Sequence, residues 1–351
     1  MKLSALFFFC ANFAVLGEKP EKFKSCQSKV VHTSPSESDF LNAQNQCYSE
    51  TTAGAGSENG TESKKEKVLT VYFIRHAQSK WNKAKERGHF YKLYSLSKDK
   101  DAALTTEGVK SAIELKDFIF SKSDGAHSGD GDRTILKGGK AIFATSNLRR
   151  AALTLLIAFA DRFQPEQKNG EAEATGTGID KIHILSALQE ISAGRDAQTH
   201  SKPGEPPVLN LKAEKCYFKG KTVNFNSVCN LGEQNSDKEK AKDSARLDDF
   251  CRWVQNNVND QPLVVSGHST WLQKFFQKKL ENSGKTAQSK TDCNTTNTIR
   301  KGNLLEECLL TKDVKLGNGA LMKFQLRLDT NVDCQIVGGS SEILHGGLEI
   351  K

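Results

Sequence analysis

The sequence predicts a three-layer α/β/α sandwich, in which helices cover both faces of a mostly parallel β-sheet. Two observations carry this prediction. Short runs of apolar and β-branched residues recur along the chain, and each is typical of a strand buried on both faces. Between them lie longer segments whose apolar residues recur every three or four positions, as on one face of a helix. Strands that alternate with helices favour a parallel sheet with helices on both sides.

The first strand is expected at residues 68–74, where the run VLTVYFI contains one polar side chain, Thr70. This run ends at Arg75 and His76. A buried parallel strand brings such residues to the carboxyl edge of its sheet, where open α/β sheets bind ligands. An arginine next to a histidine is also common on solvated surfaces, so this pair alone does not define a site.

The remaining elements are expected in the following order. A helix opens at residues 104–108 with a threonine N-cap, and its apolar face runs to Ile119. Residues 121–139 are rich in Gly, Ser and Asp and are expected to form a loop. Residues 321–328 alternate between apolar and polar side chains, which predicts a half-exposed strand at a sheet edge. Further strands are expected at 140–145, 181–186 and 262–266, and further helices begin or lie at 79–84, 147–163, 246–257 and 270–280.

The predicted folded domain covers residues 68–340, and the segments around it differ from it in composition. Residues 1–17 place a lysine before a short apolar run, as in a secretory signal peptide, although a polar asparagine interrupts that run. Residues 18–67 are polar and are expected to be a disordered tail. Inserts are expected near 201–245 and 281–298.

The long connection at residues 85–103 carries Phe90, Tyr91 and Tyr94 among basic side chains. These aromatic residues could shape a substrate pocket, but packing of the loop onto the domain is the favoured interpretation.

Cysteines and sequons favour the secretory pathway. Removal of the signal segment would leave eight cysteines, and Asn59 and Asn294 lie in glycosylation sequons within polar text. An oxidising compartment with some disulfides is therefore expected, and a cytoplasmic protein with free thiols is the alternative. The sequence contains no CxxC or HExxH, so we expect no metal site and no cofactor.

The charge pattern favours anionic substrates over nucleic acid. The net charge is +8, spread along the chain without an arginine-rich arm. We therefore expect no binding to nucleic acid, and the short N-terminal apolar run is too short for an integral membrane span. Phosphorylated substrates suit the basic balance better.

Four stretches carry a family resemblance. They are IRHAQSKWN at 74–82, SNLRRAALTLL at 146–156, LQEISAG at 188–194 and PLVVSGHS at 262–269. Together they resemble the histidine phosphatase superfamily, specifically its phosphoglycerate-mutase-like branch, over residues 68–328. The resemblance implies the phosphoglycerate-mutase-like version of the sandwich fold.

The resemblance also implies roles for particular residues. His76 matches the nucleophile, Arg75 the first phosphate-binding arginine, and Arg150 the second. Ser79 and Asn82 match positions that contact phosphate. The residues at 77–78, Ala and Gln, depart from the commoner Gly and Glu, which puts the contacts of that turn in doubt.

Two further residues complete the implied site. His268 matches the histidine that donates to the phosphate, and Glu190 matches the acid–base glutamate of this branch. An acid-phosphatase-like branch instead places an Asp directly after the second histidine. Here that position is Ser269, which favours Glu190. If Glu190 is not the acid, Asp196 is the next candidate.

Phosphoryl transfer to an imidazole requires these residue types. The attacking nitrogen must be neutral, and a hydrogen bond at the other nitrogen must hold the tautomer. Arginines supply fixed positive charge in a planar fork that matches two phosphoryl oxygens.

The expected function is hydrolysis of a phosphomonoester through a phosphohistidine at His76. The alternatives are a phosphoglycerate-type mutase and a non-catalytic phosphate-binding module. Residues 191–204 lack the tyrosine- and glycine-rich continuation through which glycolytic mutases resemble one another, which disfavours the mutase. The substrate stays open between a small molecule, a peptide and a lipid head group.

Overall fold

The computed structural model describes a single folded unit. Its described residues are 66–88, 100–121, 130–163, 180–192, 195–209, 229–232, 243–281, 293, 299–329 and 333–350. The chain divides into two units, Met1–Ser63 and Lys64–Lys351, and all described residues belong to the second. The predicted signal peptide, nearly all of the tail, both sequons, the aromatic residues of the 85–103 connection and most of both inserts lie outside the described residues.

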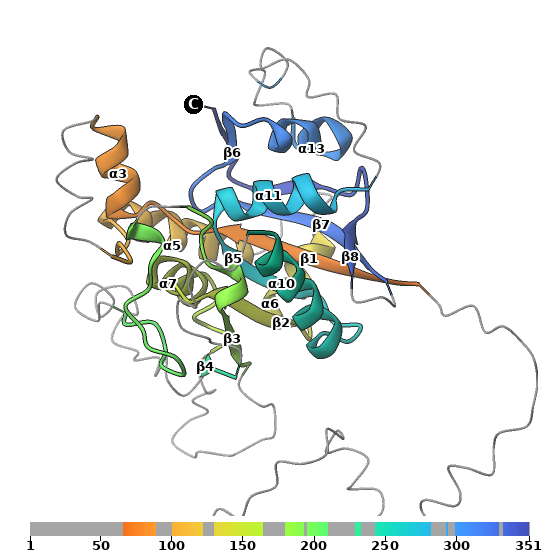
Figure 1. The fold of residues 1–351 in the computed structure, drawn as a ribbon, viewed down its shortest axis with the longest axis horizontal. Coiled ribbons are helices and arrows are strands. Elements are labelled where there is room, and N and C mark those ends of the chain that lie inside the picture. The colour runs from red at the N-terminus through yellow and green to blue at the C-terminus, as the bar shows by residue number, and fades with distance from the viewer. Residues whose placement is uncertain are drawn as a thin grey trace, which may run out of the picture. The chain divides into compact units, whose positions relative to one another are not determined.

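The centre of this unit is an 8-stranded sheet in the order β4-β3-β2-β5-β1-β7-β8, with β9 also paired to β7. The strands are β1 (Lys67–Arg75), β2 (Ile142–Ser146), β3 (Ile182–Leu185), β4 (Cys229–Asn230), β5 (Leu263–Gly267), β7 (Leu321–Leu328), β8 (Cys334–Ile336) and β9 (Glu342–His345). The strands from β4 to β1 are mutually parallel, and β7 runs antiparallel to β1 (Figure 1). The predicted mostly parallel α/β fold is confirmed.

Helices cover both faces of the sheet. They are α3 (Lys80–Glu86), α5 (Thr106–Phe120), α6 (Asp130–Gly138), α7 (Arg149–Ala158), α10 (Asp243–Asn257), α11 (Ser269–Lys279) and α13 (Gly302–Leu310), with short 3-10 turns at Ser186–Leu188 and Arg195–Ala197. Side chains of α5, α6 and α7 form one hydrophobic core, and those of α10, α11 and α13 form another. This arrangement is the predicted three-layer sandwich.

Successive side chains of strand β1 point alternately into the two hydrophobic cores. Leu69, Val71 and Phe73 belong to the core under α10 and α11, whereas Tyr72 and Ile74 belong to the core under α5 and α7. Successive side chains of a strand point to opposite faces, so an apolar residue at nearly every position is what a strand covered on both sides requires.

The prediction of a loop at residues 121–139 is wrong in its second half. Helix α6 begins at Asp130, and it buries Leu136 completely against the core that it shares with α5. Arg133 and Lys137 donate to the backbone carbonyl of Ser121 and so hold α6 to the end of α5. Polar and glycine residues dominate this segment, so its single apolar face was hidden in the sequence.

The predicted position of strand 321–328 at a sheet edge is also wrong. The strand itself is confirmed as β7, but it pairs with β1 on one side and with β8 and β9 on the other. Its polar alternation has another cause, because Lys323 forms an ion pair of 2.6 Å with Asp132 of α6. On this polar face Lys323 therefore meets a charged helix, whereas Gln325 is exposed and Arg327 partly exposed, as expected for a half-exposed strand.

The described fold continues past the predicted domain limit at residue 340. Strand β10 (Leu348–Ile350) forms a separate two-stranded antiparallel sheet with β6 (Val314–Leu316). Two disulfides, Cys251–Cys334 and Cys293–Cys308, link α10 to β8 and residue 293 to α13. Among the described helices, none is both long and apolar enough to cross a membrane.

Candidate active site

The register of the parallel strands brings the two predicted catalytic histidines together. Arg75 at the end of β1 lies opposite Gly267 at the end of β5. The next residues, His76 and His268, therefore leave the same edge of the sheet side by side. The backbone N–H of His76 donates to the carbonyl of Gly267 over 3.0 Å, and the two imidazole ring centroids are 5.0 Å apart.

The turn after His76 is fixed by two helices. The backbone N–H of Ala77 donates to Thr154 Oγ1 of α7 over 3.0 Å, and Thr105 N–H donates to the carbonyl of Gln78 over 3.0 Å. Helix α5 approaches so closely that a Cβ on Gly108 would lie 2.1 Å from the Gln78 carbonyl oxygen. The glycine of the helix opening is therefore required by close backbone contact.

The surroundings of His76 favour a neutral imidazole. Its Nδ1 lies 2.7 Å from the carbonyl oxygen of Ala77, which can only accept, so Nδ1 carries the proton. Nε2 accepts a long hydrogen bond of 3.3 Å from Arg150 Nε. Burial, followed by the charges of Arg150 and Arg75, holds the His76 pKa well below its ordinary value of 6.5. Nε2 thus has the lone pair that a nucleophile needs.

His268 directs its Nδ1 towards Glu190. Its Nε2 lies 3.0 Å from Ser146 Oγ, which itself accepts from the Leu148 N–H over 3.2 Å. A Ser146 hydroxyl that donates to Nε2 leaves the proton of the neutral ring on Nδ1. That Nδ1 is buried, has no hydrogen-bond partner among the described residues and lies 3.9 Å from Glu190 Oε2. Burial, then the charge of Arg150, lowers the His268 pKa well below its ordinary value.

Two buried arginines flank the histidines. Arg150 is 2% exposed, and its Nη1 donates to the carbonyl of Asp196 over 2.7 Å. The Nη1 of Arg75 donates to the carbonyl of Leu316 and, over 2.6 Å, to Glu349 Oε2. The Nε of Arg75 is buried without a partner among the described residues. A buried donor without an acceptor is costly, so this position favours an anionic ligand.

Glu190 follows β3 and the 3-10 turn, and its carboxyl group faces the same space. Its Oε1 accepts from the Ile191 N–H over 3.0 Å. Burial raises the Glu190 pKa, while the charges of Arg150 and Lys315 oppose that shift. Burial also raises the pKa of Asp196, against the charge of Arg150. Both carboxyl groups are therefore more easily protonated than exposed ones.

Arg75, His76, Arg150, Glu190 and Asp196 line a cavity of about 100 Å³, whereas His268 is fully buried behind it and is not part of its lining. Its lining comprises Arg75, His76, Trp81, Asn82, Lys85, Arg150, Glu190, Ser192, Asp196, Ser269, Thr270 and Lys315. Sequence reasoning missed Lys315, whose Nζ donates to Thr270 Oγ1 over 3.2 Å. Lys315 lies in a three-residue strand, too short to give a periodic signal, so nothing local marked it.

The structure separates the predicted roles of Ser79 and Asn82. The two residues form a capping box at the start of α3, with the Asn82 N–H donating to Ser79 Oγ over 3.2 Å and the Ser79 N–H to Asn82 Oδ1 over 3.2 Å. Asn82 lines the cavity, whereas Ser79 is fully buried and does not. Phosphate contact stays a prediction for both, and the geometry favours it only for Asn82.

A metal ion is a second possible occupant of this cluster. One ligand atom from each of His76, Glu190 and His268 lies within 4.8 Å of the others, which is a donor set that zinc accepts. However, buried Arg75 and Arg150 add two fixed positive charges beside it. Arg150 also donates to the only nitrogen of His76 that could bind a metal. The residues fit an anion better than a cation.

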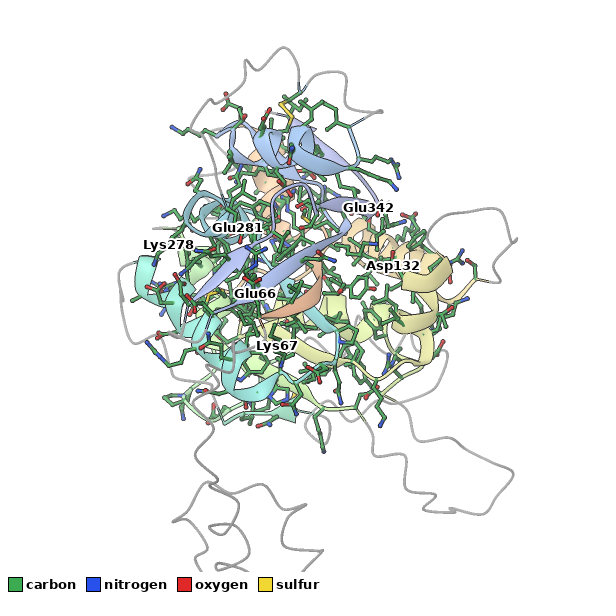
Figure 2. The ribbon with its side chains drawn as sticks, turned by 90° about the vertical axis from the view of Figure 1, so that its right-hand side faces the viewer. Glu66, Lys67, Asp132, Lys278, Glu281 and Glu342 are labelled. Carbon is green, nitrogen blue, oxygen red and sulfur yellow. A yellow bond between two sulfur atoms is a disulfide. The ribbon has the colours of Figure 1, made fainter. Side chains whose placement is uncertain are left out.

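A larger cavity of about 410 Å³ lies elsewhere, between α11, β7 and β8. Its lining includes Lys278 and Glu281 (Figure 2). The charged side chains there are paired, as in the 2.6 Å contact of Lys278 with Asp248 and the contact of Arg327 with Glu281. This lining contains no histidine, cysteine or buried unpartnered carboxylate, so the smaller cavity is the candidate active site.

Comparisons with known proteins return phosphatases. No protein-family model matches the chain, and no curated protein matches it by sequence. An Escherichia coli structure, described provisionally as an alpha-ribazole-5'-P phosphatase, has 12% identity and a TM-score of 0.37, covering 79% of this chain and 98% of its own. The phosphoserine phosphatase of Entamoeba histolytica, solved with 3-phosphoglyceric acid, has 12% identity and a TM-score of 0.32, covering 80% of this chain and 98% of its own.

A mycobacterial glucosyl-3-phosphoglycerate phosphatase has 11% identity and a TM-score of 0.31, covering 78% of this chain and 99% of its own. With such scores these matches add nothing about the reaction, and the fold assignment rests on the strand order itself. By their descriptions these three structures are phosphatases, and each shares only 11–12% sequence identity with this chain.

Proposed function

We propose that this chain hydrolyses phosphomonoesters through a phosphohistidine formed on His76. One observation carries the proposal: a buried neutral imidazole with a fixed tautomer lies between two buried arginines, in a cavity that also holds a carboxyl group of raised pKa. Positive charge arranged before the reaction stabilises the charge that develops on a phosphoryl group.

In the first step, the lone pair of His76 Nε2 attacks the phosphorus atom and the ester P–O bond breaks. The carboxyl group of Glu190 gives its proton to the departing oxygen, so an alcohol leaves. Arg75 and Arg150 bind the phosphoryl oxygens, and the Nδ1–H of His268 donates to them as well. The 3.3 Å bond between Arg150 Nε and His76 Nε2 is long and is readily exchanged for a bond to the substrate.

In the second step, the carboxylate of Glu190 removes a proton from a water molecule. The water oxygen attacks phosphorus, the P–N bond to His76 breaks, and orthophosphate leaves. His76 returns to its neutral state and Glu190 is again protonated, so the cycle closes. A single carboxyl group serves as acid and then as base, which suits a pKa raised by burial.

Trapping of the intermediate tests this proposal. A radioactive phosphomonoester, quenched rapidly, should label the wild-type chain with an acid-labile, base-stable phosphate. His76→Ala should abolish both label and turnover while keeping the thermal unfolding temperature close to that of the wild type. His200→Ala is the matched control, because His200 is exposed and does not line the cavity. Phosphate trapped on a serine or cysteine would refute the mechanism.

We also propose that the chain enters the secretory pathway. The N-terminal apolar run and the two disulfides support this, since disulfides persist in oxidising compartments. Expression in a glycosylating host should give a mature protein that begins near Glu18 and carries added mass at Asn294. An intact Met1 together with reduced thiols at residues 251 and 334 would argue against it.

A further inference from the structure

The last strand of the described fold reaches the candidate active site. Strand β10 pairs with β6 so that Glu349 lies opposite Lys315, and its side chain extends to Arg75. Glu349 Oε2 accepts from Arg75 Nη1 over 2.6 Å, and Oε1 accepts from the Asn318 N–H over 2.9 Å. One carboxylate thus holds both the arginine and the turn between β6 and β7.

The contact engages one particular end of the Arg75 guanidinium. Both N–H groups of Nη1 have acceptors, the carbonyl of Leu316 and the carboxylate of Glu349. The edge formed by Nε and Nη2 carries two parallel N–H groups, which match two oxygens of a phosphoryl group. Nε is buried and has no partner in the described part of the chain. The two contacts of Nη1 therefore leave the edge formed by Nε and Nη2 available for bidentate binding of a ligand.

The carboxylate lies outside the space where that ligand would bind. Arg75 lines the cavity, but Glu349 does not. The Arg75 side chain is 5% exposed and the Glu349 side chain 42%, so the carboxylate approaches the guanidinium from the solvent side. A carboxylate that competed with the substrate would have to lie on the cavity side of Arg75, and Glu349 does not.

We infer that Glu349 is a positioning residue that orients the guanidinium of Arg75 for bidentate binding of the transferred phosphoryl group. Glu349 also steadies the backbone on which Arg75 depends, because the turn that it holds at Asn318 leads to Ala320, whose carbonyl accepts from the Arg75 N–H over 3.0 Å. This inference rests on the proposed function, since it concerns the phosphoryl site of that reaction.

A double-mutant cycle with matched controls tests the role. The rate of His76 phosphorylation by 4-nitrophenyl phosphate is measured for Glu349→Ala, Arg75→Ala and the double variant. A small displacement of a group that binds the reacting phosphoryl group is expected to lower the rate about tenfold or more. Glu349→Ala should therefore phosphorylate His76 about tenfold or more slowly than the wild type. In the Arg75→Ala background, Glu349→Ala should cause no further loss. Glu349→Gln, which keeps an acceptor but loses the charge, should retain more activity than Glu349→Ala.

The control is Glu342→Ala on strand β9, which precedes β10 in the chain and pairs with β7. Glu342 pairs with Lys301 over 2.7 Å and with Lys323 over 3.4 Å, and it does not line the cavity (Figure 2). Its replacement should leave the phosphorylation rate unchanged.

Three results would overturn the inference. An equal loss from Glu349→Ala with and without Arg75 would show a general structural role, and a gain in kcat/KM would show that Glu349 competes with substrate. No change at all would show that the contact is idle. If the wild type shows no turnover, the proposed function fails, and orthophosphate titration of the same four proteins still decides the role of Glu349. The effect of Glu349→Ala on orthophosphate affinity should then vanish in the Arg75→Ala background, and additive effects would refute the coupling.

Discussion

Replacement of Glu190 by Gln separates acid catalysis from substrate binding. Glutamine has the same size and keeps an oxygen that can accept from the Ile191 N–H, the 3.0 Å bond of the native carboxyl group. It cannot give a proton to a leaving oxygen. The change therefore removes the proposed acid while it preserves the shape of the cavity.

The size of the effect depends on the leaving group. An alkoxide needs a proton in the transition state, whereas a nitrophenolate departs without help. Burial raises the Glu190 pKa, which favours the protonated carboxyl group that the proposed first step needs. General acid catalysis contributes about a hundredfold to ten-thousandfold, so phosphorylation of His76 by an alkyl phosphate should slow by about a hundredfold or more. Phosphorylation by 4-nitrophenyl phosphate should change much less.

Rapid-quench measurement of the phosphoenzyme is the assay. With the aryl substrate, Glu190→Gln should accumulate phosphoenzyme, because the second step has lost the base that activates water. Asp196→Asn is the matched control, since Asp196 lines the same cavity and its Oδ2 lies 3.7 Å from Arg150 Nη2. It should slow both substrates by similar factors, because it disturbs Arg150, the proposed ligand of the phosphoryl group.

An equal loss for both substrates in Glu190→Gln would show that Glu190 only positions the substrate. If Asp196→Asn instead slowed the alkyl phosphate alone, Asp196 would be the acid.

Other predictions concern pH and packing. The kcat/KM for an alkyl phosphate should rise with pH through the lowered pKa of His76, well below 6.5, as the nucleophile becomes neutral, and fall through the raised pKa of Glu190, above 4.5, as the acid is lost. At pH values above the Glu190 pKa, Glu190→Gln should also have a higher unfolding temperature than the wild type. As the pH rises, the carboxyl group ionises near 4.5 in the unfolded chain but only at higher pH in the folded one, so its ionisation favours unfolding of the wild type. Gly108→Ala should cost about 1–3 kcal/mol of unfolding free energy and lower activity, because its Cβ would meet the Gln78 backbone in the turn after His76. Gly131→Ala, in open space on α6, is the control and should be neutral or stabilising in thermal denaturation.

The sequence by itself determined the elements that carry the site. The apolar run before Arg75 and His76 and the one before His268 each predicted a buried parallel strand, and parallel strands end at a common edge. The closeness of the two histidines, with ring centroids 5.0 Å apart, follows from that rule. Such signals are local, because side-chain periodicity and a strand end are encoded within a few residues.

Only the tertiary structure decided what surrounds those elements. The alternation of apolar and polar residues in 321–328 could not reveal that β8 and β9 pair with the edge of β7 opposite β1. The residues of one strand do not specify which later segment pairs with it. The Arg75–Glu349 contact joins residues 274 positions apart, and the Cys251–Cys334 disulfide joins residues 83 positions apart. Ion pairs, disulfides and sheet edges depend on which distant segments pack together, and that is settled by burial of the whole chain and not by the residues next to each group.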